Sequence, residues 1–164
     1  MISAALISKI NEQIERSVHL TGFVPAGQLQ WRPPIPGAWS IGEVLGHLLD
    51  CLAGFCAVLY AAHPESLRHF ADLQQLPVNH VCGPDEASER IGHYRRHIDQ
   101  GFALLKDEDL DKKLPTVFVT GGETLLMLLL GNLEHLINHK HQLFMYLKLM
   151  AVNVGTEDLY RFRG

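Results

Sequence analysis

The stretch SIGEVLGHLLDCLAGFCAVL, residues 40–59, decides the fold class because it predicts a long helix with a clear beginning. Ser40 can accept a hydrogen bond from the first helical turn, and Glu43, three residues later, can return one, which is the pattern of a capping box. Trp39 before the cap and Val44 after it are spaced to form a hydrophobic staple. Apolar residues then recur every three or four positions, as on the buried face of a helix: Ile41, Leu45, Leu48, Leu52, Phe55 and Leu59.

Three further segments have the same helical spacing of apolar residues. They cover residues 2–22, residues 84 or 85 to about 106, and residues 123 to about 150. Between the helices we expect a proline-rich loop at 24–39, an irregular or short-helical connection at 61–82, and a loop at 107–122 that contains a short β-prone piece, TVFVTGG. The sequence therefore predicts an all-α fold: a four-helix bundle with long connections after the first and third helices, in a single domain over residues 1–164.

Composition and charge narrow the class of partners and the compartment. The net charge is -4 and Lys and Arg form no cluster, so we expect no nucleic-acid partner. Wholly apolar runs such as residues 125–130 are far shorter than the ~20 residues that span a bilayer, and the N-terminus lacks the uninterrupted apolar stretch of a signal peptide. Three cysteines without a CxxC spacing are typical of a reducing compartment. We therefore expect a cytoplasmic protein with no membrane partner.

Two of the ten histidines point to a metal site. His135 and His139 are four residues apart on the predicted last helix, so both imidazoles project from one face. Two neutral imidazoles at this spacing can reach one divalent ion at about 2.1 Å each, and a third ligand must come from another element. His47, inside the capped helix, is the natural candidate. The alternative is that each of the three is an ordinary hydrogen-bonded histidine of the core or its boundary.

The other histidines and the cysteines are weaker candidates for metal ligands. His93 and His97 also lie four residues apart, but their helix face is polar, and we place them at the solvated surface. His141 follows the metal pair by two residues and so points about 200° away around the helix. Cys51, one turn after the histidine of the capped helix, can serve as a fourth ligand, although a small buried hydrophobe is its simpler role.

The last helix also offers side chains that can support a metal site. Asn138 and Gln142 can orient a ligand imidazole, and Tyr146, one turn beyond Gln142, can line the same cavity. A zinc-protease motif is excluded because Leu136, and not a glutamate, follows His135. A glycine-rich phosphate loop is excluded too, because the GG at 121–122 lacks the lysine and the preceding strand of that motif.

Two segments together resemble the DinB superfamily. The stretch WSIGEVLGHLLD (39–50) resembles the second-helix motif of that family, HLINHKHQLFMYLKLMAV (135–152) resembles its last-helix motif, and RPPIPGAWS (32–40) fits its proline-containing lead-in. The resemblance implies a four-helix bundle, often a homodimer, that holds one divalent metal ion, nickel or zinc, with waters at the open positions. By position the three ligands are His47, His135 and His139. The sequence departs from the family pattern, which commonly has His, Arg and Gly there, at Asn138, Lys140 and His141.

The resemblance also implies a kind of chemistry. The family includes thiol-dependent enzymes, resembling bacillithiol transferases and a mycothiol-dependent maleylpyruvate isomerase, so a low-molecular-weight thiol and a small-molecule substrate are the expected partners. The leading hypothesis is therefore a metal-dependent enzyme for thiol transfer or hydrolysis. The alternatives are a non-catalytic metal-binding or stress-response bundle, which a fourth protein ligand such as Cys51 would favour, and a plain interaction bundle without metal.

Overall fold

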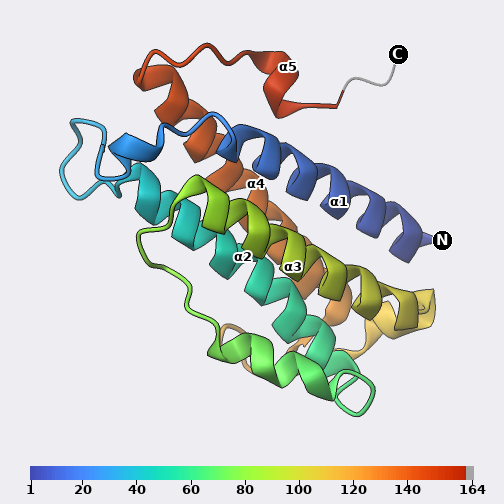
Figure 1. The fold of residues 1–164 in the computed structure, drawn as a ribbon. Helices are drawn as coiled ribbons and strands as arrows, with labels where there is room; N and C mark the ends of the chain where they lie inside the picture. The colour runs from blue at the N-terminus through green and yellow to red at the C-terminus, as the bar shows by residue number, and fades with distance from the viewer. Residues whose placement is uncertain (162–164) are drawn as a thin grey trace.

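The computed structural model describes residues 1–161 and arranges them around four long helices (Figure 1). These are α1 (Ile2–Thr21), α2 (Ile41–Ala62), α3 (Pro84–Leu104) and α4 (Leu125–Leu149). Both α1 and α2 pack against α3 and α4, so α1 and α2 occupy opposite corners of the bundle. The predicted all-α class is confirmed, and each helix lies within two residues of its predicted bounds at both ends.

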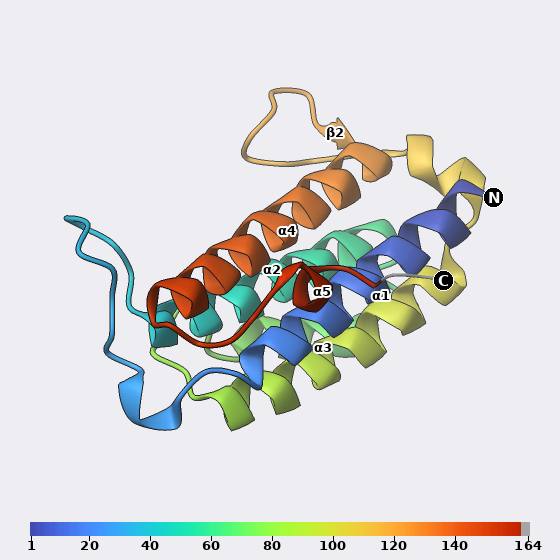
Figure 2. The ribbon, with the colours of Figure 1, turned by 90° about the horizontal axis from the view of Figure 1, so that it is seen from above.

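The directions of the helices explain why the connection between the second and third helices crosses the whole bundle, which the sequence did not predict. Figures 1 and 2 show α2 and α3 running in one direction and α1 and α4 in the other. Because α2 and α3 are parallel, the chain must return along the whole bundle between them, and residues 63–83 do so. This connection contains the 3-10 helix η2 (Arg68–Gln75). The connection after the second helix is thus long too, in addition to the two predicted ones. The connection between α1 and α2 contains the 3-10 helix η1 (Ala26–Gln28).

The predicted capping box at the start of α2 is present. The backbone nitrogen of Ser40 donates to Glu43 Oε2 at 2.6 Å, and the backbone nitrogen of Glu43 donates to Ser40 Oγ at 3.2 Å. At the start of α4 the hydroxyl of Thr124 accepts from the backbone nitrogen of Met127 at 3.3 Å. These caps satisfy backbone donors that the helix leaves free and so fix where each helix begins. They therefore fix the positions of the histidines that follow.

The core forms where the apolar stripes of the four helices meet. Its largest fully buried side chains are Tyr94 of α3, Phe55 of α2 and Phe70 of η2. After α4 the chain turns back, and the short helix α5 (Thr156–Leu159) packs on α1 with Leu159 buried. The described part of the tail thus lies over the surface of the bundle.

The β-prone piece TVFVTGG is not a strand, which corrects the prediction for residues 116–122. After the 3-10 helix η3 (Asp107–Asp111), β1 (Lys113–Leu114) pairs antiparallel with β2 (Glu123–Thr124), and the TVFVTGG stretch is the loop between them. Val117 and Phe118 are 93% and 89% exposed. Gly121 and Gly122 have positive φ angles of 90° and 83°, which turn the chain instead of extending it. Strand propensity without a neighbouring strand to pair with does not make a strand.

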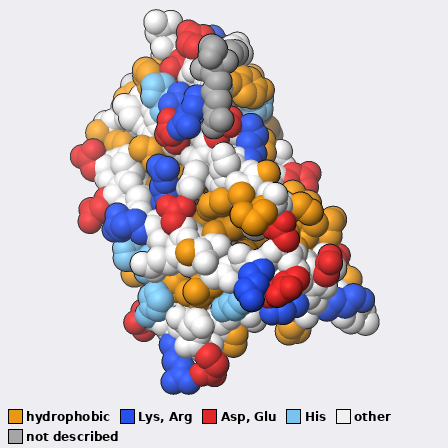
Figure 3. Space-filling model, turned by 90° about the vertical axis from the view of Figure 1, so that its right-hand side faces the viewer, with side chains coloured by type: hydrophobic (Ala, Val, Ile, Leu, Met, Phe, Trp, Pro, Cys, Tyr) orange, Lys and Arg blue, Asp and Glu red, His pale blue; other side chains and the backbone are white. Residues whose placement is uncertain are grey.

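One helix of the described part, α2, is long and apolar enough to cross a membrane by length and composition alone. The central helix of a soluble protein passes the same test, and α2 packs against both α3 and α4. On the face of the molecule in Figure 3, hydrophobic side chains gather in patches among interspersed acidic and basic ones.

Candidate metal centre

The three histidines of the predicted trio come together across the contact between α2 and α4. His47 extends from α2, and His135 and His139 extend from neighbouring turns of α4. His47 Nε2 lies 2.9 Å from His135 Nε2, and the ring centroid of His139 lies 4.3 Å from that of His47 and 4.8 Å from that of His135. One nitrogen from each ring lies within 4.8 Å of the other two. All three side chains are half-buried, so the site is partly shielded but open to solvent.

Two amide oxygens fix the orientation of two of these imidazoles. His47 Nδ1 lies 2.6 Å from Asn79 Oδ1, and His139 Nδ1 lies 2.7 Å from Gln142 Oε1. A carbonyl oxygen accepts hydrogen bonds, so each Nδ1 carries the proton and donates. The lone pair of each neutral ring then resides on Nε2, which is the tautomer a metal ligand needs.

Asn79 is a residue that sequence reasoning missed, and the crossover places it. The backbone nitrogens of Asn79 and Cys82 donate to the carbonyl oxygens of Gly46 and Gly42 on α2, at 3.0 Å each. A Cβ at Gly46 would overlap the backbone oxygen of His80, so only glycine lets the crossover lie this close to α2. Asn79 itself has a φ of 59°, a left-handed conformation that asparagine tolerates well. The signal in the sequence for this close packing was the pair of glycines, Gly42 and Gly46, four residues apart inside an apolar helix.

Trp39 forms a wall of the site, and its role was also missed. Its ring stacks on His139 at 5.6 Å between centroids and 23° between planes, and lies 4.6 Å from the ring of His47. A shallow cavity of about 260 Å³ lies here, lined by Trp39, Glu43, His47 and Asn79. Trp39 was predicted to staple the start of α2, but a staple predicts no contact with the last helix. The indole shields the imidazoles from water on this side.

Asp50 supplies the carboxylate that the sequence analysis did not place. Its Oδ2 lies 3.9 Å from His47 Nδ1, and its side chain is half-exposed. It also lines a second, larger cavity together with His135. The spacing of three residues between His47 and Asp50 on one helix was the signal that could have found it.

Burial favours the neutral form of the two histidines of the trio that lie on α4. Desolvation lowers the pKa of His135, and the nearby imidazole of His47 lowers it further. Desolvation also lowers the pKa of His139, although the hydrogen bond from its ring to Gln142 acts in the opposite direction. Neutral imidazole is the form that binds a metal, so the environment favours ligation at neutral pH.

Of the three residues predicted to support the site, two are connected to the trio in the structure and one is not. Gln142 binds His139 as described, and its Nε2 donates to the hydroxyl of Tyr146 at 3.2 Å. Tyr146 is buried and packs edge-on against Trp31. Asn138 is exposed, and its side chain forms no hydrogen bond within the described residues. The chain of contacts therefore runs from the trio through Gln142 to Tyr146 and bypasses Asn138.

His93 and His97 are not at the solvated surface, which corrects their predicted environment. Both are half-buried, and the ring of His97 lies 5.2 Å from that of Phe70 and 4.6 Å from that of His93. The reason is the crossover, whose η2 segment contributes His69 and Phe70 to this face of α3. The pair does not belong to a metal-ligating group among the described residues.

The trio has no fourth protein ligand within the described residues. No further His, Cys, Asp or Glu joins the three histidines as a group of close donor atoms. Cys51 is fully buried, and burial raises the pKa of its thiol to about 12. Three imidazoles, two of which have an Nδ1 hydrogen bond that directs the Nε2 lone pair toward the centre, fit a divalent ion such as zinc or nickel and leave coordination positions open.

Comparison with known proteins identifies the family and the fold. The model of the DinB superfamily matches residues 10–143. The chain belongs to the DinB superfamily. Among solved structures, the DinB-like protein YjoA from Bacillus subtilis has a TM-score of 0.72 and 18% sequence identity, over 96% of this chain and 99% of that one. At this identity the likeness shows a shared DinB-like fold. No curated protein matches the sequence.

Proposed function

We propose that this DinB-superfamily protein binds one divalent metal ion, nickel or zinc, through His47, His135 and His139 and uses it in a reaction of a small molecule. The observation that carries the proposal is the convergence of three half-buried imidazoles, two of which have their Nδ1 protons held by Asn79 and Gln142. Metal-ligating histidines almost always donate their second ring N–H to such an acceptor.

The proposed chemistry is activation of a low-molecular-weight thiol for transfer to an electrophile. When bound, a divalent ion supplies a Lewis acid that lowers the pKa of a coordinated thiol or water. The residues of the chain do the rest: Asn79 and Gln142 orient the imidazoles, and Trp39 excludes water from one side. We assign acceptance of the proton that the thiol releases to Asp50, whose carboxylate lines the cavity beside His135.

Hydrolysis is a second candidate, because Asp50 could serve it equally well. A carboxylate beside the trio can accept a proton from water as well as from a thiol. The two reactions differ in the nucleophile, so an assay with and without added thiol separates them. A non-catalytic metal store is less well supported, because the closed four-ligand site it would favour is not formed within the described residues.

The first test is the metal content of protein purified without an affinity tag. We expect about one equivalent of nickel or zinc in the wild type and in His93→Ala, and loss of the metal in His135→Ala. His93 is a matched control because it also lies on a long helix and is also half-buried among other histidines. A wild-type protein with less than about a tenth of an equivalent after incubation with either ion would refute metal binding.

The second test is activity. Metal-loaded protein is assayed for conjugation of cysteine or bacillithiol to chlorodinitrobenzene, and for hydrolysis of nitrophenyl acetate without thiol. We expect thiol conjugation above the rate with free metal and loss of that rate in His135→Ala. If the protein hydrolyses the ester but conjugates no thiol, hydrolysis replaces thiol transfer as the proposed reaction. If it does neither, the protein binds metal without catalysing either reaction.

A further inference from the structure

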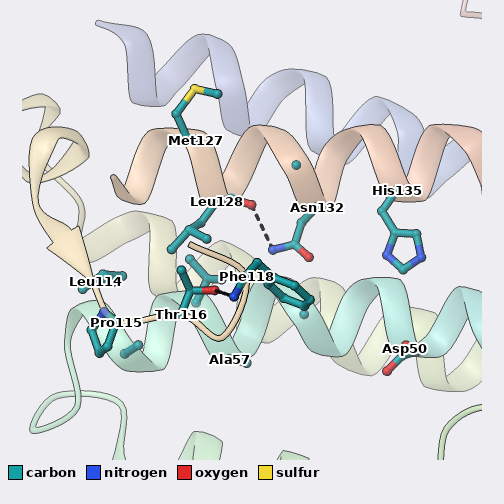
Figure 4. Close-up of a pocket in the computed structure, with 14 residues that line it drawn as sticks. Asp50, Ala57, Leu114, Pro115, Thr116, Phe118, Met127, Leu128, Asn132 and His135 are labelled. Carbon is teal, nitrogen blue, oxygen red and sulfur yellow. Dashed lines mark hydrogen bonds between the residues drawn. The ribbon is translucent and has the colours of Figure 1, made fainter. Parts of the chain in front are cut away.

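A cavity of about 620 Å³ lies in the groove between α2 and α4, next to the trio but distinct from it (Figure 4). Its lining is mostly apolar, from both helices and from the β1–β2 hairpin: Ala57, Val58, Leu114, Pro115, Met127 and Leu128. A volume of several hundred Å³ with few polar groups is typical of a small-molecule site. It is larger than the cavity beside Trp39, so the apolar space of the site lies on this side.

Small residues keep this cavity open. Ala57 and Ala61 line the cavity from successive turns of α2, and Gly131 lines it from α4. A Cβ at Gly131 would meet no atom within 4 Å, so nothing in the folded protein occupies that space. The first half of α4 is apolar almost all round in sequence, yet Met127 is 53% exposed there. The groove accounts for this apolar face, which no other helix covers.

The charged and titratable groups of the cavity lie at its end at the trio. His135 lines the cavity and lies in hydrogen-bond range of His47, so a molecule in the cavity reaches the imidazoles directly. Asp50 lies on the opposite helix at the same end, as Figure 4 shows. It is the one charged side chain of the lining besides the titratable His135. A negative charge there disfavours an anionic ligand and tolerates a neutral one.

The hairpin loop provides a cover for the other end. Phe118 extends over the groove between α2 and α4 (Figure 4), although it is 89% exposed. An aromatic side chain this exposed gains from burial, at about 25 cal/mol for each Å² of apolar surface removed from water. A ligand bound beneath Phe118 would cover part of its ring and remove that apolar surface from water.

We propose that this cavity binds an uncharged aliphatic or aromatic group of the substrate whose reacting atom is held at the trio. The inference rests on the proposed function for the identity of the reacting end, and names the substrate class as an apolar thiol or apolar electrophile. Four observations carry it: an open volume, an apolar lining, a floor of small residues, and continuity with His135. A second copy of the chain is a poorer occupant, because the cavity ends at the polar trio and not at a further apolar surface.

The test is direct binding of an uncharged aromatic probe, N-phenylnaphthylamine, to metal-free protein, followed by its fluorescence. We expect one saturable site, and at least tenfold weaker binding in Gly131→Phe, whose ring would fill the cavity. Gly92→Phe is the matched control, because Gly92 is also a helical glycine and its nearest Cβ neighbour is the end of a flexible side chain, Arg96 Nη1 at 3.9 Å. Unchanged binding in Gly131→Phe, or equal loss in both variants, would overturn the inference.

Further measurements separate this inference from the proposed function and from self-association. Because the probe assay needs no metal, His139→Ala, which changes a residue of the trio outside the cavity lining, should still bind the probe within a few-fold even if metal is lost. Octanethiol should displace the probe at a concentration at least tenfold lower than ethanethiol, and equal potency would overturn the inference. Light scattering of the wild type completes the set: probe affinity that falls as protein concentration and mass rise would assign the groove to a second copy instead.

Discussion

The nitrogen that each imidazole presents to its neighbours is decided by side chains outside the trio. Asn79 receives the Nδ1 proton of His47, and Gln142 receives that of His139. If either amide were absent, the ring could rotate or change tautomer, and the geometry for a metal would be lost part of the time. At the scale of the residue, the candidate site therefore consists of five side chains and not of three.

Replacing Asn79 tests this directly. Asn79→Gly keeps the positive φ of 59° without strain but removes the acceptor, so we expect metal affinity to fall by about 10–100-fold with little change in stability. Asn79→Asp keeps an acceptor oxygen and should retain the affinity. Competition with a chromophoric chelator measures both, and equal affinity in the wild type and the glycine variant would show that the amide does not support the site.

The lowered pKa values of His135 and His139 predict a loss of stability in acid. Because burial depresses their folded-state pKa below the unfolded value of 6.5, the unfolded chain takes up protons first as the pH falls. The free energy of unfolding of the metal-free protein should therefore decrease from pH 7 to pH 5. Urea unfolding at a series of pH values checks this, and a double His→Gln variant at both positions should have a shallower dependence. An equal slope in the variant would contradict the assignment.

At the scale of the element, the sequence predicted the positions of the helices better than it predicted which segments pack on their faces. The capping box of α2 is local, so Ser40 and Glu43 sufficed to find it. The polar face of α3 around His93 was also visible, but its partial burial by η2 depends on a segment that is distant in the sequence. The TVFVTGG stretch failed for the same reason, since pairing partners decide whether β-branched residues form a strand.

Lys140 ties three elements together, and its replacement should loosen the tail. It is buried on α4, and its Nζ donates to Gln13 Oε1 of α1 at 2.7 Å and to the backbone oxygen of Leu159 at 2.9 Å. Burial lowers its pKa to about 8. Lys140→Met removes the donor from both buried acceptors, so we expect a loss of about 1–3 kcal/mol in the free energy of unfolding. The tail from residue 153 onward should become sensitive to proteases.

The matched control for that prediction is Lys9→Met. Lys9 pairs with Glu12 on the exposed surface of α1, where such a pair contributes little. Urea unfolding and limited proteolysis of the two variants should therefore differ clearly. If Lys140→Met is as stable as Lys9→Met, the buried lysine does not anchor the tail.

At the scale of the whole molecule, the site depends on three segments that meet because of the bundle topology. His47 and the α4 pair were predictable from helical spacing and from the two motifs, since each lies in a recognisable helix. Asn79 was not, because its segment has no periodicity and reaches the site only by the return of the crossover. Trp39 lies inside a quoted motif, but it stacks on His139 of α4, and local spacing does not show tertiary contacts.

The contact of the crossover with α2 can be tested at a single glycine. In Gly46→Ala the new Cβ would overlap the backbone oxygen of His80 and lie 2.8 Å from its nitrogen, so the crossover must move and carry Asn79 away from His47. We expect a loss of about 1–3 kcal/mol in the free energy of unfolding together with weaker metal binding. Gly131→Ala adds the same methyl group to a helix where it meets no atom within 4 Å, and should stabilise the protein by about 0.5–1 kcal/mol. Because both variants gain the same helix propensity, the difference between their unfolding free energies measures the crossover contact. A Gly46→Ala protein with wild-type stability and wild-type metal affinity would mean that the crossover does not position the site.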